Sequence, residues 1–526
     1  MAAAATTADP FSDVPDDLLV HIISFLPVRD AARTAVLARR WRPLWLLTGS
    51  INLDSASYRK QTRTYSYYNN TDDEIDGGRL FADALAAIAT TSRPKRPVRR
   101  MSLFMEAYSD RACGAALGSG SGGRYSNHDN YSRLQYLLVE PSLRELEEVR
   151  VGFRLTKDDH LRYILKLVLR PEFLPSAQSL RVLDLAFTRL ELPTAAGGGV
   201  SFPRLASVRL VKCSILISQL EALTRAAPAL AALHIESPDG GYGIHDTDRL
   251  LLHCPNLVAL TMADAYLGSV IDLYAPRLRS FSYSGGYYSG EFSMKSAATN
   301  LMEVNLNFNV YIGRTGDREL SGFFWKFLGS LRSTKALKLR LLHVKHLLVD
   351  EAALDEPLPV LYRLERLELE APQDPDRRKD SAAAMATLLR QCPVICHCQL
   401  QFEETYSWRR KGADVRSKFD ASVELFNKRE SKEINALMLE DDGEDSSCVP
   451  DLPGLTGCWF SCLQSHLKYV KLQFELTRLN CFEVCLAKFL AENCKVLEVL
   501  QIEDGDQHFL SHINRKVERW RLNALN

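Results

Sequence analysis

One short pattern, Leu-x-x-Leu-x-Leu, repeats along the chain from residue 180 onward and constrains the fold more than any other feature. Its first six copies start at Leu180, Leu205, Leu230, Leu257, Leu278 and Leu301. A period of roughly 20–30 residues predicts supersecondary units that stack side by side into a solenoid. Alternation along each strand should place the leucines in the core and the residues between them on an outer surface.

Further copies extend this pattern toward the C-terminus. LERLEL, LKYVKL and LEVLQI start at Leu364, Leu467 and Leu497, and LKLRLLHV from Leu337 should supply another strand. Segments 216–228 and 247–255 have apolar spacing suited to the second, helical half of a repeat. The pattern fits leucine-rich repeats, and we therefore expect an α/β solenoid over residues 96–438.

The segment 11–54 is a separate unit, and it predicts three short helices. Pro15 suits a helix start, Pro27 stops that helix, and a broad apolar stripe lies between them. A second short helix and a third, basic helix with Trp41, Leu44 and Trp45 should follow. So few residues cannot cover this much apolar surface, so the segment should dock onto something.

The elements VPDDLLVHIISFLP and LARRWRPLW of this segment resemble an F-box in order and spacing. The resemblance implies binding to a Skp-family adaptor and, through it, to a cullin and a ubiquitin-conjugating machinery. The adaptor contacts that it implies are Val14, Pro15, Leu18, Leu19, Ile22, Leu26, Val36, Trp41, Leu44 and Trp45. The alternative is a helical unit that packs on the protein's own body.

Residues 460–526 read as strand, helix, strand, helix. HLKYVKL, FLAEN and KVLEVLQI resemble the FBD domain of plant F-box/leucine-rich-repeat proteins, although the Gly-containing turn usual after the first strand is absent. We further expect a disordered tail over 1–10, a linker with one helix over 55–95 and an acidic, flexible break over 439–459.

Composition excludes several classes of partner. Lys plus Arg and Asp plus Glu both number 65, so no net charge attracts nucleic acid or an anionic membrane. The sequence contains neither an apolar run long enough for a membrane span nor a secretory signal. Its 12 cysteines therefore suggest reduced thiols and a cytoplasmic or nuclear location.

No motif in the sequence indicates catalysis or a bound cofactor. Cys392, Cys396, His397 and Cys398 lie too close together for the two separated pairs of ligands that a tetrahedral zinc site needs. We interpret them as small thiols of a buried strand, and expect no metal. Nucleotide-binding glycine loops and serine-nucleophile elbows are also missing, so we expect a non-catalytic protein.

Outward positions of the repeats predict where a target protein binds. They are chemically mixed: Asp184, Arg209, His234, Thr261, Ser282, Asn305, Lys338, Glu368 and Lys471. The contact is expected to centre on Thr261, Ser282, Tyr283, Tyr287, Tyr288 and Asn305, because tyrosine is enriched at interface centres. The alternative is that SYSGGYYSG forms a turn whose rings pack locally.

The resemblance implies a substrate-recognition subunit of a Skp–cullin–F-box ubiquitin ligase. The F-box should bind the adaptor, and the repeats should bind the target. Two alternatives stay open: a repeat scaffold that does not lead to degradation, and a co-receptor for a small molecule.

Overall fold

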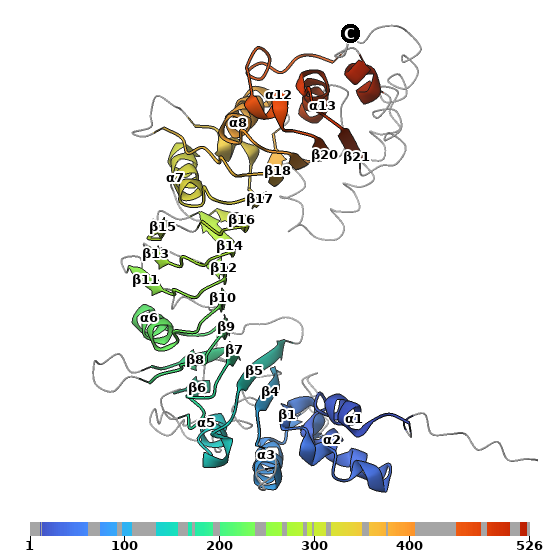
Figure 1. Cartoon of the computed structure of the whole chain (residues 1–526), viewed down its shortest axis with the longest axis vertical. Helices are drawn as coiled ribbons and strands as arrows, with labels where there is room; N and C mark the ends of the chain where they lie inside the picture. The colour runs from blue at the N-terminus through green and yellow to red at the C-terminus, as the bar shows by residue number, and fades with distance from the viewer. Residues whose placement is uncertain are drawn as a thin grey trace, which may run out of the picture. The chain divides into compact units, whose positions relative to one another are not determined.

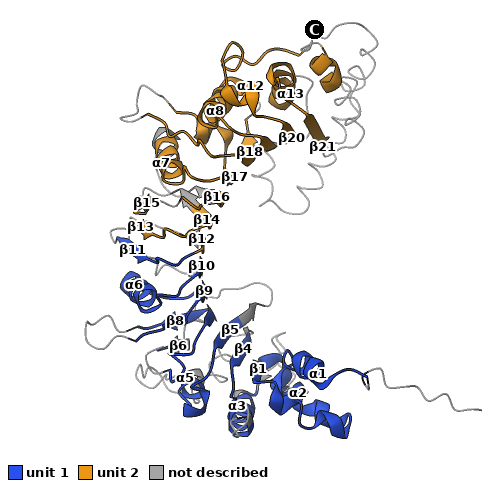
Figure 2. Ribbon diagram, viewed as in Figure 1, with its two compact units in different colours: residues 1–257 blue, residues 258–526 orange. Residues whose placement is uncertain are grey.

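The computed structural model describes residue 11 and residues 13–60, 74–91, 97–107, 133–155, 167–170, 174–192, 200–236, 249–265, 271–287, 292–296, 299–311, 317–349, 357–374, 377–404, 449–474, 481–504 and 516–522. Two compact units divide the chain, residues 1–257 and 258–526 (Figure 2). Each combines parallel strands with helices (Figure 1), which confirms the predicted α/β class.

The first unit is built on a parallel sheet in the order β1-β4-β5-β7-β9-β10. Its strands are β1 (Ser50–Asp54), β2 (Arg59–Lys60), β3 (Glu74–Ile75), β4 (Arg100–Ala107), β5 (Glu148–Leu155), β6 (Leu167–Leu169), β7 (Val182–Ala186), β8 (Thr188–Leu190), β9 (Ser207–Val211), β10 (Ala232–Glu236) and β11 (Leu250–His253). Its α-helices are α1 (Asp16–Ile23), α2 (Val28–Arg33), α3 (Gly77–Thr91), α5 (Arg133–Leu138) and α6 (Ile217–Ala226). Its 3-10 helices are η1 (Thr34–Val36), η2 (Arg39–Trp41), η3 (Trp45–Leu47), η4 (Ser55–Tyr58) and η5 (Pro141–Leu143).

The second unit repeats this plan, with a parallel sheet in the order β12-β14-β16-β17-β18-β19-β20-β21. Its strands are β12 (Ala259–Ala265), β13 (Ile271–Tyr274), β14 (Ser280–Tyr287), β15 (Phe292–Met294), β16 (Glu303–Tyr311), β17 (Ala336–Arg340), β18 (Arg366–Gln373), β19 (His397–Glu404), β20 (Tyr469–Phe474) and β21 (Val499–Asp504). Its helices are α7 (Asp317–Ser330), η7 (Val344–Leu347), α8 (Arg378–Gln391), α12 (Ser461–Ser465), α13 (Phe482–Asn493) and a last one at 516–522.

The consensus leucines occupy the core, as the pattern predicted. The first leucine of each copy from Leu180 to Leu301 is at most 2% exposed. In several copies its N–H also closes a turn just before the strand: Leu205 donates to the carbonyl of Phe202, and Leu257 to that of Cys254. Each leucine thus fixes both the apolar core and the point where the next strand begins.

The C-terminal segment has the predicted order of strand, helix, strand and helix, since β20, α13, β21 and the helix at 516–522 follow one another. Its two strands continue the sheet from β19, with Leu400 beside Leu472 and Leu472 beside Ile502. These residues therefore form the last units of the same sheet.

Three expectations were wrong in their local structure. Residues 250–253 form β11 rather than a helix, because Leu250 and Leu252 are buried while Leu251 points outward, a period of two. The third N-terminal helix is reduced to the short 3-10 helices η2 and η3, and strand β1 follows. Within the predicted flexible break, the described residues 449–459 pack inward at Leu452 and Leu455.

We expect alternate residues of one strand to differ sharply in their contribution to stability. Leu339 of β17 is fully buried, so Leu339→Ala should lower the free energy of unfolding by about 2–5 kcal/mol. Lys338, its outward neighbour, pairs with exposed Glu368 at 3.1 Å, and Lys338→Ala should cost less than about 1 kcal/mol. Urea denaturation of the two variants measures this difference, and equal losses would contradict the alternation.

Candidate functional site

The N-terminal helical segment, residues 13–54, divides its apolar residues into two groups. The first forms a small core of Leu19, Ile23, Ala31, Trp41 and Leu44, against which Val14, Val20, Leu26 and Trp45 pack. Leu19, Trp41 and Leu44 were predicted to contact the adaptor directly, but their side chains are buried inside the segment. These three side chains therefore stabilise the fold of the segment itself.

The second group of apolar side chains stays exposed. Leu18, Ile22 and Phe25 lie four and three residues apart along α1 and just beyond its end, so they share one side of the helix. They are 55%, 49% and 65% exposed. Val36 and Leu37 at η1 are also exposed, as is Pro15. Sequence reasoning missed Phe25 and Leu37, although Phe25 continues the spacing of Leu18 and Ile22.

A set of polar contacts holds the start of α1 in place. The guanidinium of Arg40 bonds the carboxylate of Asp16 at 2.6 Å and the main-chain oxygens of Val14 and Phe11. Phe11 packs edge-on against Trp41 at 5.9 Å between ring centroids. The exposed side of α1 is thus presented by an ordered scaffold.

The predicted outward positions of the repeats form one continuous row in each unit. In the first unit the register joins Asn52, Ser102, Arg150, Asp184, Arg209 and His234. In the second it joins Thr261, Ser282, Asn305, Lys338, Glu368, Gln399, Lys471 and Gln501. Residues read from separate copies of the pattern are therefore neighbours on one face of a sheet.

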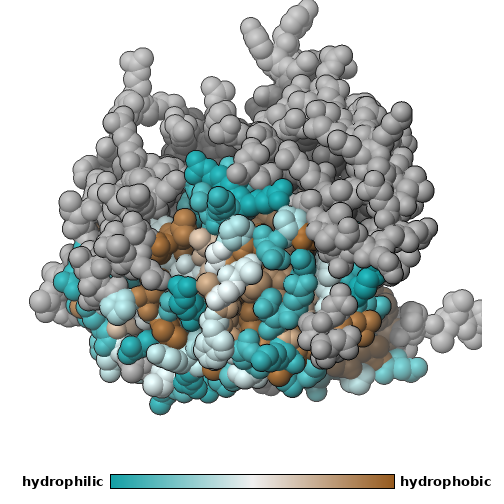
Figure 3. All heavy atoms as spheres, turned by 90° about the horizontal axis from the view of Figure 1, so that it is seen from above, coloured by the Kyte–Doolittle hydropathy of each residue, from teal (hydrophilic) through white to brown (hydrophobic). Residues whose placement is uncertain are grey.

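Some neighbouring side chains in these rows pair with each other. Arg209 pairs with Asp184 at 3.3 Å, and Lys338 with Glu368 at 3.1 Å. Within the described residues, Thr261, Ser282 and Asn305 have no side-chain hydrogen-bond partner. Seen from above in Figure 3, the described part of the surface mixes hydrophilic and hydrophobic residues.

Tyr283 is not on this outward face, contrary to the prediction. It is 8% exposed and packs against Phe308 and Phe327, with ring centroids 5.5 and 6.0 Å apart. The reason is visible in LRSFSY, where Tyr283 takes the last leucine position of the repeat. Tyr287 ends β14 with only its backbone described, and Tyr288 lies outside the described residues.

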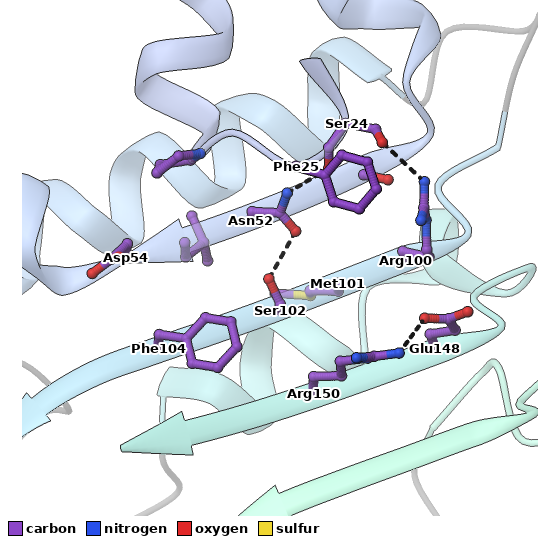
Figure 4. Close-up of a pocket in the computed structure, with 13 residues that line it drawn as sticks. Ser24, Phe25, Asn52, Asp54, Arg100, Met101, Ser102, Phe104, Glu148 and Arg150 are labelled. Carbon is purple, nitrogen blue, oxygen red and sulfur yellow. Dashed lines mark hydrogen bonds and ion pairs between the residues drawn. The ribbon is translucent and has the colours of Figure 1, made fainter. Parts of the chain in front are cut away.

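A groove of about 330 Å³ lies where the N-terminal helical segment meets the first strands (Figure 4). We call it the junction groove. It is lined by Ser24, Phe25, Pro27, Ser50, Asn52, Leu53, Asp54, Arg100, Met101, Ser102, Phe104, Glu148 and Arg150. Its floor is the outward face of β1, β4 and β5, and the end of α1 forms its other wall.

Asn52 of β1 connects the strands of the junction groove to the end of α1. Its Nδ2 donates to the carbonyls of Ser24 at 2.7 Å and Leu26 at 3.1 Å, both just beyond the end of α1. Its Oδ1 accepts from the hydroxyl of Ser102 at 2.7 Å, and Arg100 donates to the Ser24 hydroxyl at 3.2 Å. These bonds satisfy backbone groups at the helix end and join the helical segment to the sheet.

Buried cysteines gather in the second unit, among them Cys392, Cys398, Cys462 and Cys494. Burial raises the pKa of the Cys398 thiol to about 12 and that of the Cys462 thiol to about 11. These thiols stay protonated near neutral pH and so lack the thiolate that nucleophilic chemistry needs. No three His, Cys, Asp or Glu side chains are placed to hold a metal ion in the part of the chain that the structure describes.

We expect the cysteines of the second unit to react with iodoacetamide in order of exposure. At pH 8, exposed Cys458 should be modified in the folded protein, while buried Cys398 and Cys462 should react only after denaturation. Peptide mapping by mass spectrometry resolves each position, with Cys458→Ser as the control. Fast native modification of Cys398 would contradict its burial.

Comparison with known proteins identifies two regions of the chain. The family model of the F-box domain matches residues 11–48. The family model of the leucine-rich repeats of the FBD-associated F-box protein At5g56370 matches residues 134–302. No helix in the described ranges combines the length and the apolar character that crossing a membrane requires.

Curated relatives of Arabidopsis thaliana carry the same combination in their names. The putative F-box/LRR-repeat protein At5g41840 is 31% identical over 106 residues, which are 20% of this chain and 19% of that protein. The F-box/LRR-repeat protein At3g26922 is 41% identical over 58 residues, 11% of this chain and 19% of its own length. The F-box/FBD/LRR-repeat protein At4g00160 is 42% identical over 59 residues, 11% and 13% of the two chains. The chain thus aligns with less than a fifth of each of these relatives.

Proposed function

We propose that this chain, an F-box protein with leucine-rich repeats of the FBD-associated type, is the substrate-recognition subunit of a Skp–cullin–F-box ubiquitin ligase. It binds a Skp-family adaptor through the F-box and a target protein through the repeat sheet. Its own role is non-catalytic, since it brings the target to the ubiquitin-transferring enzymes. We place this activity in the cytoplasm, the nucleus or both.

The exposed apolar side of α1 is the observation that carries the adaptor half of this proposal. Leu18 and Ile22 point away from the core that Leu19 and Ile23 form, so folding of this chain leaves them in water. Large apolar side chains that stay exposed beside each other mark protein interaction sites. The adaptor contact therefore includes Pro15, Leu18, Ile22, Phe25 and Val36, while Leu19, Trp41 and Leu44 support it from below.

The repeat sheet supports the target half of the proposal. A row of outward side chains at fixed spacing presents a wide surface to one partner. Thr261, Ser282 and Asn305 contribute polar groups that no described neighbour uses, whereas adjoining charges neutralise each other in pairs. Such a mixed polar surface suits a protein better than a phosphate backbone.

Charges introduced on the exposed side of α1 should strongly weaken adaptor binding. Leu18→Asp combined with Ile22→Asp should cost about 2 kcal/mol or more, roughly thirtyfold in affinity, because desolvated anchors are lost. Titration of the full chain with a purified Skp-family adaptor measures the loss.

Leu216→Asp is the matched control for this experiment, since Leu216 is 64% exposed and precedes α6. It should leave adaptor affinity unchanged. Equal affinities of the double variant and the control would refute the adaptor assignment.

Bulky charges in the outward row of the second unit should prevent target capture. Ser282→Arg combined with Asn305→Arg should reduce target recovery in cells with the proteasome blocked, at unchanged adaptor binding, because both positions face outward in adjacent strands. Quantitative proximity labelling compares this variant with Arg225→Glu, a charge change on helix α6. Undiminished recovery of all labelled partners would exclude this part of the sheet as the target site.

A further inference from the structure

We propose that the junction groove binds a short extended peptide segment that carries one bulky apolar side chain and a carboxylate one or two residues away. This inference rests on the proposed function, because the segment belongs to a target protein. It names a binding site apart from the outward row at Thr261, Ser282 and Asn305. The groove lies entirely within the first unit.

Two exposed aromatic rings form the apolar part of the junction groove. Phe25 lies just beyond the end of α1, and Phe104 lies on β4, where it is 37% exposed (Figure 4). Exposed rings that line a concave site supply contact area and lose little conformational entropy on binding. A bulky apolar side chain of a ligand fits between them, above the hydrogen-bonded Asn52 and Ser102.

A glycine determines where the ring of Phe104 lies. Gly152 pairs with Phe104 across β4 and β5, and a Cβ built on Gly152 would lie 2.7 and 2.8 Å from Cδ1 and Cε1 of that ring. Any other residue at position 152 forces the ring to move. The glycine thus lets Phe104 cover the neighbouring strand and stay in the groove.

Arg100 and Arg150 provide the charged part of the groove. Arg100 donates to the Ser24 hydroxyl, and Arg150 pairs with Glu148 at 3.2 Å, which leaves most of their guanidinium N–H donors for a ligand. With Glu148 included, this end carries one net positive charge. The carboxylate of Asp54 lies toward the other end of β1, where it accepts the N–H of Ala56. The charge therefore favours a carboxylate beside Arg100 and Arg150.

The spacing of these groups matches an extended peptide. Arg150 and Gly152 are two residues apart on one strand, or about 6.6 Å. Two residues of an extended ligand span the same distance. The apolar and acidic side chains of such a ligand reach the two parts of the groove together. A groove of about 330 Å³ holds one large side chain with its neighbours rather than a folded domain.

Binding of synthetic peptides to the full chain tests this proposal. The panel consists of acetylated hexapeptides in which Leu, Phe or Trp is followed by Asp or Glu directly or after one alanine. Parallel arms end in a free carboxylate without an internal acid, or lack both acids. Fluorescence polarisation should show binding of acid-containing peptides and at least roughly tenfold weaker binding of acid-free ones. A preference for either source of carboxylate supports the proposal.

Variants of the groove make the test specific. Gly152→Ala should weaken the best peptide roughly threefold to tenfold by displacing Phe104, and Arg150→Gln roughly tenfold by removing a charge-assisted bond. Gly322→Ala is the matched control, because a Cβ at Gly322 meets nothing within 4 Å. The proposal is overturned if no peptide binds, if acid-free peptides bind equally well, or if Gly152→Ala and Arg150→Gln bind like Gly322→Ala.

Adaptor titration of the same variants separates this inference from the proposed function. Gly152→Ala and Arg150→Gln should bind the adaptor normally, and Leu18→Asp with Ile22→Asp should bind the peptide normally. If the unmodified chain does not bind the adaptor, the proposed ligase role is refuted. If it binds the adaptor but none of the peptides, only the proposed peptide site in the junction groove is refuted.

Discussion

The parallel register between successive strands is the constraint on which the other features depend. Each copy of the leucine pattern aligns its buried side chains with those of the next, as the pairs Leu306 with Leu339 and Leu339 with Leu369 show. A slip by one residue would turn every leucine outward, so burial of the inner row fixes the register. The outer rows follow from the same alignment, whether or not their side chains pair with one another.

Most of the fold could be predicted from the sequence because this constraint is local and periodic. The strands at Leu205, Leu230 and Leu337 and the α6 helix follow from apolar spacing alone. Predictions failed where the sequence allowed an apolar residue to lie either in the core or on the surface. Tyr283 was assigned by residue type to the outer surface, whereas its position in LRSFSY placed it in the core. Residues 250–253 contain three successive leucines, and only packing showed their period of two.

The candidate sites were less predictable for a related reason. In the F-box the sequence shows a broad apolar stripe, but not which part of it the chain buries itself. Leu19 and Trp41 proved to be internal, while Leu18 and Ile22 remain exposed. The junction groove brings Phe25, Phe104 and Arg150 together from segments far apart in the sequence, and only the folded chain places them side by side. No local pattern records such a juxtaposition.

The position of Phe25 links the two sites proposed in the first unit. Its ring continues the exposed side of α1 after Leu18 and Ile22, and it also lines the junction groove. Asn52 fixes the end of α1 to β1 and β4 through three hydrogen bonds, so this ring has a defined place relative to Phe104. A partner that moves Phe25 from one side therefore changes the groove on the other. Because coupling between binding sites is reciprocal, a peptide in the groove must alter adaptor affinity by the same factor as the adaptor alters peptide affinity.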